Sequence, residues 1–120
     1  LPDIYRPQPG MFIAQVIGES MNRRIPNGSW CLFRANPQGT RAGKVVVAQH
    51  RSIADPESGG SYTVKVYSSE KSQSLDGDWR HTSVELSPDS RDPSFKPLVF
   101  DSQAAESVKI VAELIGVLDS

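Results

Sequence analysis

Short apolar runs separated by turn-forming residues are the feature that most constrains the fold of this chain. Val45–Gln49 is a continuous, β-branched run of the kind found in buried strands. Residues 29–34 alternate as a strand directly after the turn residues of Pro26-Asn27-Gly28. Asp76-Gly77 predicts a tight turn, so the flanking runs, 62–68 and 79–86, should pair as a hairpin. The pattern predicts a mainly β fold of short strands and hairpins.

The C-terminal segment is ambiguous between helix and strand. The apolar positions of residues 104–118 fit a buried helix almost as well as a strand. Alternation of Val108, Ile110, Ala112 and Leu114, with frequent β-branched residues, favours a strand from about Val108.

The other segments are simpler to interpret. Residues 11–17 are a short apolar run broken by Gln15, and residues 96–101 are a further strand. Residues 1–10 hold three prolines and no periodic pattern, which predicts an extended arm. With 120 residues in total, we expect residues 11–120 to form one domain.

Composition excludes several classes of protein. The apolar fraction of 38% and charged fraction of 22% are ordinary for a globular chain, and the net charge of −1 gives no electrostatic argument for nucleic acid. The single cysteine, Cys31, excludes an internal disulfide and fits a reducing, cytoplasmic location. We expect it to be a small core residue. No apolar run approaches the roughly 18 residues of a membrane span. The isolated His50 and His81 offer no metal site, and no cofactor is expected.

Ser20 and Lys65 are the candidate reactive residues. Ser20 follows the strand of residues 11–17, and Lys65 lies in the run Tyr62-Thr63-Val64-Lys65-Val66. A serine hydroxyl needs a base to remove its proton, and a lysine can be that base only when it is neutral. Because a lysine usually has a pKa of about 10.4, a lysine base needs surroundings that lower its pKa by about 3, or roughly 4 kcal/mol. Strand alternation places Thr63, Lys65 and Tyr67 on one face, so aromatic and short polar neighbours surround the amine.

Simpler interpretations of the same residues exist. A serine before a polar turn is usually a turn or cap residue, and a strand lysine usually points to solvent. A second pattern, Ser68-Ser69-Glu70-Lys71, matches the Ser-x-x-Lys motif of β-lactamases. That motif needs a helix, whereas we expect residues 68–71 to lie in a polar loop.

Seven short stretches occur in the order typical of one peptidase family. They are Gly18-Glu19-Ser20-Met21 with Pro26-Asn27-Gly28-Ser29, then 43–48, 63–65, 84–88, 95–99 and 114–118. With these, the chain resembles the C-terminal peptidase domain of the LexA family, which includes UmuD-type proteins and phage repressors. The resemblance covers about residue 11 to the end and implies a LexA/signal-peptidase-like β domain.

The resemblance implies roles for individual residues. Ser20 corresponds to the nucleophile, Lys65 to the general base, and the backbone N–H groups of Ser20 and Met21 to the oxyanion site. The chain departs from the family where Asn27-Gly28-Ser29 replaces Asp-Gly-Asp, Val66 replaces a frequent Arg, and Ser90 replaces a common Asn. These departures concern substrate preference more than the dyad.

The resemblance also implies partners. We expect a serine peptidase that cuts a peptide segment of its own chain or of a partner, in SOS, stress or phage-related regulation, and acts as a homodimer. The apolar C-terminal strand, which would otherwise leave an exposed edge, is expected near the dimer interface. Nucleic acid would be contacted only through a further N-terminal module.

Two other functions also fit the sequence. The domain could be a catalytically silent module for dimerisation or partner binding, or it could resemble the signal peptidases. The absence of an apolar anchor in these residues argues against the second, as does Val66-Tyr67 in place of an Arg-Val motif.

Overall fold

The computed structural model describes residues 6–37, 39–53, 61–73 and 79–119, and half of the chain is in strands. The elements, in chain order, are β1 Met11–Val16, β2 Ser29–Ala35, β3 Val45–Gln49, β4 Tyr62–Gln73, β5 Trp79–Ser87, β6 Leu98–Asp101, α1 Ser102–Ala105 and β7 Lys109–Asp119. The mainly β fold class is therefore confirmed. Residues 6–10 are exposed and belong to no helix or strand, and the rest of the predicted arm lies outside the described residues.

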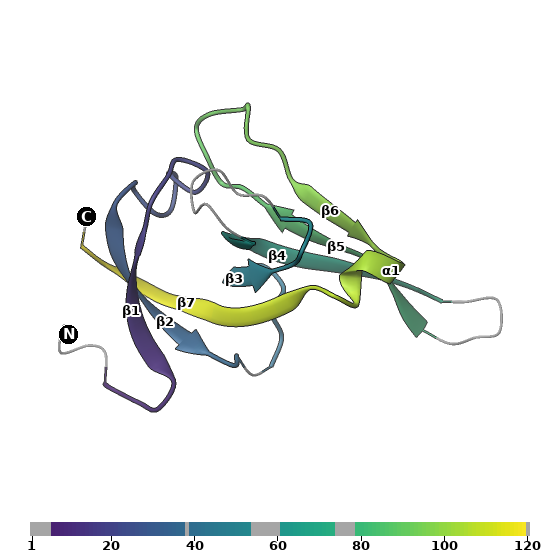
Figure 1. The fold of residues 1–120 in the computed structure, drawn as a ribbon, viewed down its shortest axis with the longest axis horizontal. Helices are drawn as coiled ribbons and strands as arrows, with labels where there is room; N and C mark the ends of the chain where they lie inside the picture. Colours follow the sequence, from purple (N-terminus) through teal and green to yellow (C-terminus); the bar gives the residue numbers. More distant parts are fainter. Residues whose placement is uncertain (1–5, 38, 54–60, 74–78, 120) are drawn as a thin grey trace.

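The strands form one antiparallel sheet in the order β1-β2-β7-β3-β4-β5-β6. The last strand in the chain, β7, therefore lies inside the sheet, where it joins the β1–β2 hairpin to β3 and the strands beyond it (Figure 1). The prediction of a C-terminal strand is confirmed. β2 pairs with β7 from Ala112 to Asp119, whereas β3 pairs with it only from Lys109 to Glu113. Beyond Glu113, one edge of the strand therefore has no paired strand among the described residues, as the prediction of an exposed edge requires. The sheet edges are β1 and β6.

The β4–β5 hairpin is longer than the sequence predicts. Val66 pairs with Ser87 at one end and Gln73 with Trp79 at the other. Residues 68–71 are thus part of β4, and the prediction of a polar loop there is wrong. A strand with one solvated face tolerates such polar residues because cross-strand backbone bonds, and not apolar burial, hold it in place. The predicted turn at Asp76-Gly77 lies outside the described residues.

Two apolar clusters pack against the sheet. The first consists of Met21, Ile25, Cys31, Phe33, Val45 and Ala112, and the second of Val46, Ala48, Ile53, Val84, Leu86 and Phe100. Since side chains of β3 alternate between faces, Val45 joins the first cluster and Val46 the second. Each fully buried large side chain, such as Phe33 or Leu86, contributes about 2–3 kcal/mol of transfer free energy.

Two turns depend on a glycine, and the first of them confirms the turn predicted at Pro26-Asn27-Gly28. Gly28 has φ +87° and donates its N–H to Val16 O at 2.8 Å, which closes the β1–β2 connection. Gly43 has φ +77° in the turn before β3, and its N–H donates to Tyr67 O at 2.8 Å. Residues with a Cβ rarely adopt these angles. Ala42-Gly43 is therefore a structural turn.

Candidate active site

Strand pairing fixes the position of Lys65. It lies on β4 opposite Val46 of β3, while its sequence neighbours Val64 and Val66 pack against the first apolar cluster. Only 6% of the lysine is exposed. An amine with so little access to water has lost much of the solvation that favours its charged form.

Ser20 lies in the connection between β1 and β2, within a tight turn. Gly18, with φ +119°, precedes it, and the Gly18 N–H donates to Asn27 Oδ1 at 2.7 Å. An asparagine offers the same acceptor oxygen here as an aspartate would, so replacement of Asp by Asn27 preserves this contact. Met21 O then accepts from the N–H groups of Arg24 and Ile25 at 2.9 and 2.7 Å, which forms one helical turn directly after the serine.

The fold brings Ser20 and Lys65 together across 45 residues of sequence. Lys65 Nζ lies 3.0 Å from Ser20 Oγ, 2.6 Å from Thr63 Oγ1 and 3.1 Å from the carbonyl oxygen of Val64. Ser20 and Thr63 are 7% and 3% exposed, so the three polar side chains meet in a buried place. The predicted placement of Thr63 beside Lys65 on one face of the strand agrees with these distances.

These contacts are compatible with a neutral lysine and with a charged one. A neutral amine has two N–H bonds and one lone pair. If it donates to Thr63 Oγ1 and Val64 O, its lone pair can accept the Ser20 O–H at the 3.0 Å contact. In the charged form the same amine would donate to all three oxygens. The arrangement can therefore transfer a proton from the serine to the lysine without moving heavy atoms.

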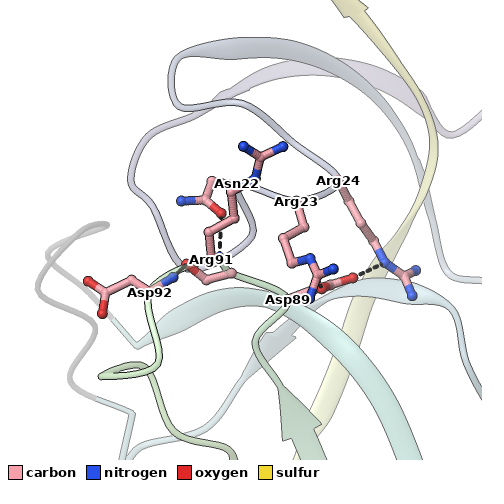
Figure 2. Close-up of polar contacts among 7 residues, drawn as sticks. Asn22, Arg23, Arg24, Asp89, Arg91 and Asp92 are labelled. Carbon is pink, nitrogen blue, oxygen red and sulfur yellow. Dashed lines mark hydrogen bonds and ion pairs between the residues drawn. The ribbon is translucent and has the colours of Figure 1, made fainter.

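A loop after β5 contacts the serine turn, and sequence reasoning missed it. Asp89 donates its backbone N–H to Ser20 O at 2.9 Å and accepts from the Arg23 N–H at 3.0 Å. Its carboxylate accepts from Arg24 Nε at 2.6 Å, and Asn22 Oδ1 accepts from the Arg91 N–H at 2.8 Å (Figure 2). The match at Val84-Glu85-Leu86-Ser87-Pro88 ended one residue before Asp89, and nothing in the sequence connects it with Arg24, 65 positions earlier.

Other candidate groups lie elsewhere. Cys31 is fully buried, as predicted, and burial raises the pKa of its thiol above the ordinary 9.0, which keeps it protonated and unreactive. His50 is buried against Phe100, and its Nδ1 accepts from the Ser52 N–H.

In the part of the chain that the structure describes, no group of His, Cys, Asp and Glu could hold a metal ion. Within that same part, no helix has the length and apolar character needed to cross a membrane.

The fold and this site define a class: a mainly β domain in which a buried serine from a turn and a buried lysine from a strand are hydrogen-bonded. The sequence model of the Peptidase S24-like family matches residues 1–115. The chain belongs to that family, which is the family of LexA, UmuD and phage-repressor C-terminal domains, and so has a serine-peptidase fold. A comparison with curated proteins gives no match.

Proposed function

We propose that this domain is a serine peptidase that uses Ser20 as nucleophile and Lys65 as general base. The observation that carries the proposal is the 3.0 Å contact between Lys65 Nζ and Ser20 Oγ in a buried site. This distance lies within hydrogen-bond reach of a nucleophile and its base. Membership of a peptidase family supports the same assignment.

The reaction proceeds in two halves. Neutral Lys65 takes the Ser20 proton as Oγ attacks a peptide carbonyl carbon, and the carbonyl π electrons move to its oxygen. When the tetrahedral intermediate collapses, the C–N bond breaks and the lysine gives its proton to the leaving amine. Water then attacks the acyl-enzyme with Lys65 again acting as base, and the serine recovers its proton.

The oxyanion is assigned to the backbone N–H groups of Ser20 and Met21. The helical turn closed by Met21 O supports the assignment of the Met21 N–H, because the first N–H groups of such a turn have no acceptor within it, and the Ser20 N–H directly precedes that turn. These groups and the serine Oγ belong to the same short segment. A carbonyl attacked by Ser20 would therefore place its oxygen beside them.

The substrate is an extended peptide segment, in cis or in trans, laid along a sheet edge. β1 supports this part of the proposal, because it is an edge strand and leads directly into the turn that holds Ser20. Unpaired backbone groups on an edge strand can accept another strand by β-augmentation. By family likeness, the biological setting is SOS, DNA-damage or phage-related control of transcription in the cytoplasm.

Labelling with a fluorophosphonate, which reacts with activated serines, tests the proposal. Wild type should be labelled, Ser20→Ala should not, and Ser69→Ala on β4 should be labelled as wild type is. Persistent labelling of Ser20→Ala would contradict the nucleophile assignment. A wild type that is never labelled would favour the alternative, a silent module that binds partners.

A further inference from the structure

The serine and the lysine reach each other from distant parts of the sheet. Ser20 lies between β1 and β2, whereas Lys65 is on β4, and the strands β2, β7 and β3 separate β1 from β4 in the sheet order. The connection that carries the serine is a loop, so its position is not set by strand pairing. A catalytic pair placed this way needs a contact that fixes the loop against the lysine strand.

The segment after β5 provides such a contact. Ser87, the last residue of β5, pairs with Val66, which is next to Lys65 in sequence. Asp89 follows two positions later and bonds the serine turn through both of its backbone groups. The nucleophile turn is thereby tied to the strand pair that carries the base.

The Asp89 side chain makes this link specific to its residue type. The carboxylate accepts from Arg24 Nε at 2.6 Å and lies 3.8 Å from Arg23 Nε. Asp89 is 29% exposed, Arg24 46% and Arg23 64%, so the Arg24 contact is the more sheltered of the two. Figure 2 shows the two segments facing each other, with the dashed contacts Arg24–Asp89 and Asn22–Arg91 between them. A backbone contact is available to any residue, whereas an ion pair requires these two.

We propose that Asp89 and Arg24 form a positioning clamp that holds Ser20 at reaction distance from Lys65. This inference rests on the proposed function, since it concerns the same dyad. Asp89 does not touch the reacting atoms and acts through the backbone of Ser20 and Arg23. Loosening the clamp should slow the attack by the serine while leaving the binding of the probe intact.

The first test measures fluorophosphonate labelling as a function of probe concentration. For Asp89→Asn and Arg24→Gln, we expect the maximal labelling rate to fall about 10-fold, with the half-saturating concentration unchanged. The double variant should lose no more than the single variants, because the two side chains act as one unit. Asp92→Asn is the matched control: its carboxylate accepts from the Ser94 N–H within the same loop, so labelling should stay at the wild-type rate. If Asp89→Asn is labelled at the wild-type rate, the proposal is wrong. It is also wrong if Asp92→Asn lowers the labelling rate as much as Asp89→Asn does.

The second test does not depend on activity. The Arg23 amide donates to Asp89 O, so its hydrogen exchange reports on the clamp. Its protection should fall about 10-fold in Asp89→Asn and stay unchanged in Asp92→Asn. If wild type is never labelled at Ser20, the proposed function fails, and exchange alone decides on the clamp. Unchanged protection of the Arg23 amide in Asp89→Asn would then overturn it.

Discussion

At Lys65 the decisive quantity is the charge of a single amine, because only its neutral form has a lone pair to accept the serine proton. We predict that the labelling rate rises with pH until the lysine is largely deprotonated. Lys65→Met should lower the rate by at least about 100-fold, the contribution of a general base. The exposed Lys96→Met serves as control and should keep the wild-type profile. A rate that is flat from about pH 6 to 10 would rule out a lysine base.

Glu113 is the residue with a defined pH signature in folding. This buried carboxylate on β7 accepts from Arg34 Nη2 at 2.7 Å and Lys44 Nζ at 3.3 Å. The Arg34 hydrogen bond holds the pKa of Glu113 below its ordinary 4.5, although burial opposes this effect. A lowered folded-state pKa gives stability that is present above the unfolded pKa and is lost as pH falls through the folded pKa.

Glu113→Gln should therefore lower the free energy of unfolding at pH 7 by about 1–3 kcal/mol, as expected for hydrogen bonds to charged groups. The difference from wild type should shrink as pH falls through the lowered folded-state pKa, where the wild-type carboxylate becomes protonated too. Urea unfolding at pH 7, 5 and 3 measures it, with the exposed Glu106→Gln as control. A difference that is the same at all three pH values would show that the charge is not its cause.

At the scale of elements, the turn before β3 gives a conformational prediction. Gly43 has φ +77° and open space where a Cβ would stand, so a substitution meets backbone strain and no clash. Gly43→Ala should lower the free energy of unfolding by about 1 kcal/mol. Gly43→Asn should cost less, because asparagine tolerates this region better. Urea unfolding of both variants measures these changes, with Ala42→Ser as the control. Equal losses of unfolding free energy in Gly43→Ala and Gly43→Asn would refute the backbone explanation.

Short sequence patterns predicted the strands and turns whose conformation depends mainly on their own residues. The run Val45–Gln49 is a strand with those bounds, and the turn at Asn27-Gly28 is where its residue types indicate. Residues 68–71 were mispredicted because the pairing partner that makes them a strand, β5, lies outside their own window. For the same reason the central place of β7 was missed, although its alternation predicted a strand.

The candidate site was predictable only in part. Ser20 and Lys65 follow from motif and chemistry, and Thr63 from strand alternation. Asp89 and Arg24 could not be paired, because an ion pair 65 positions apart leaves no periodic trace in a single sequence.

At the scale of the whole molecule, we propose a two-fold dimer with the C-terminal part of β7 near the interface. β2 pairs with one edge of residues 112–119, whereas β3 pairs with the other edge only as far as Glu113, so this second edge can pair with a second copy of the chain. Val117 of β7 and Trp30 of β2 expose 37% and 48% of their area on neighbouring strands. Apolar side chains exposed together are typical of association surfaces.

Sedimentation over a range of concentrations checks the dimer. Trp30→Ser should shift the equilibrium toward monomer. Val99→Ser removes an even more exposed apolar side chain from edge strand β6 and should leave the equilibrium unchanged. If the wild-type chain stays monomeric at high concentration, the dimer proposal is wrong.

The last prediction concerns the Ala42–Gly43 bond, because the resemblance to the LexA family implies cleavage at Ala-Gly or Cys-Gly bonds. A segment that binds by β-augmentation must be extended, with its backbone groups free to pair. Here the Gly43 N–H donates to Tyr67 O, the Lys44 N–H donates to Arg41 O at 3.0 Å, and Gly43 has a left-handed φ. We therefore predict that the chain does not cut itself at this bond.

The measurement is the intact mass of the purified chain after incubation at about pH 10, where a lysine near its reference pKa begins to lose its proton. The mass should not change. A synthetic extended peptide that contains an Ala-Gly bond, added in trans, should be cut by wild type and not by Ser20→Ala. Fragments ending at Ala42 in wild type, and absent from Ser20→Ala, would show that the turn opens far enough to become a substrate.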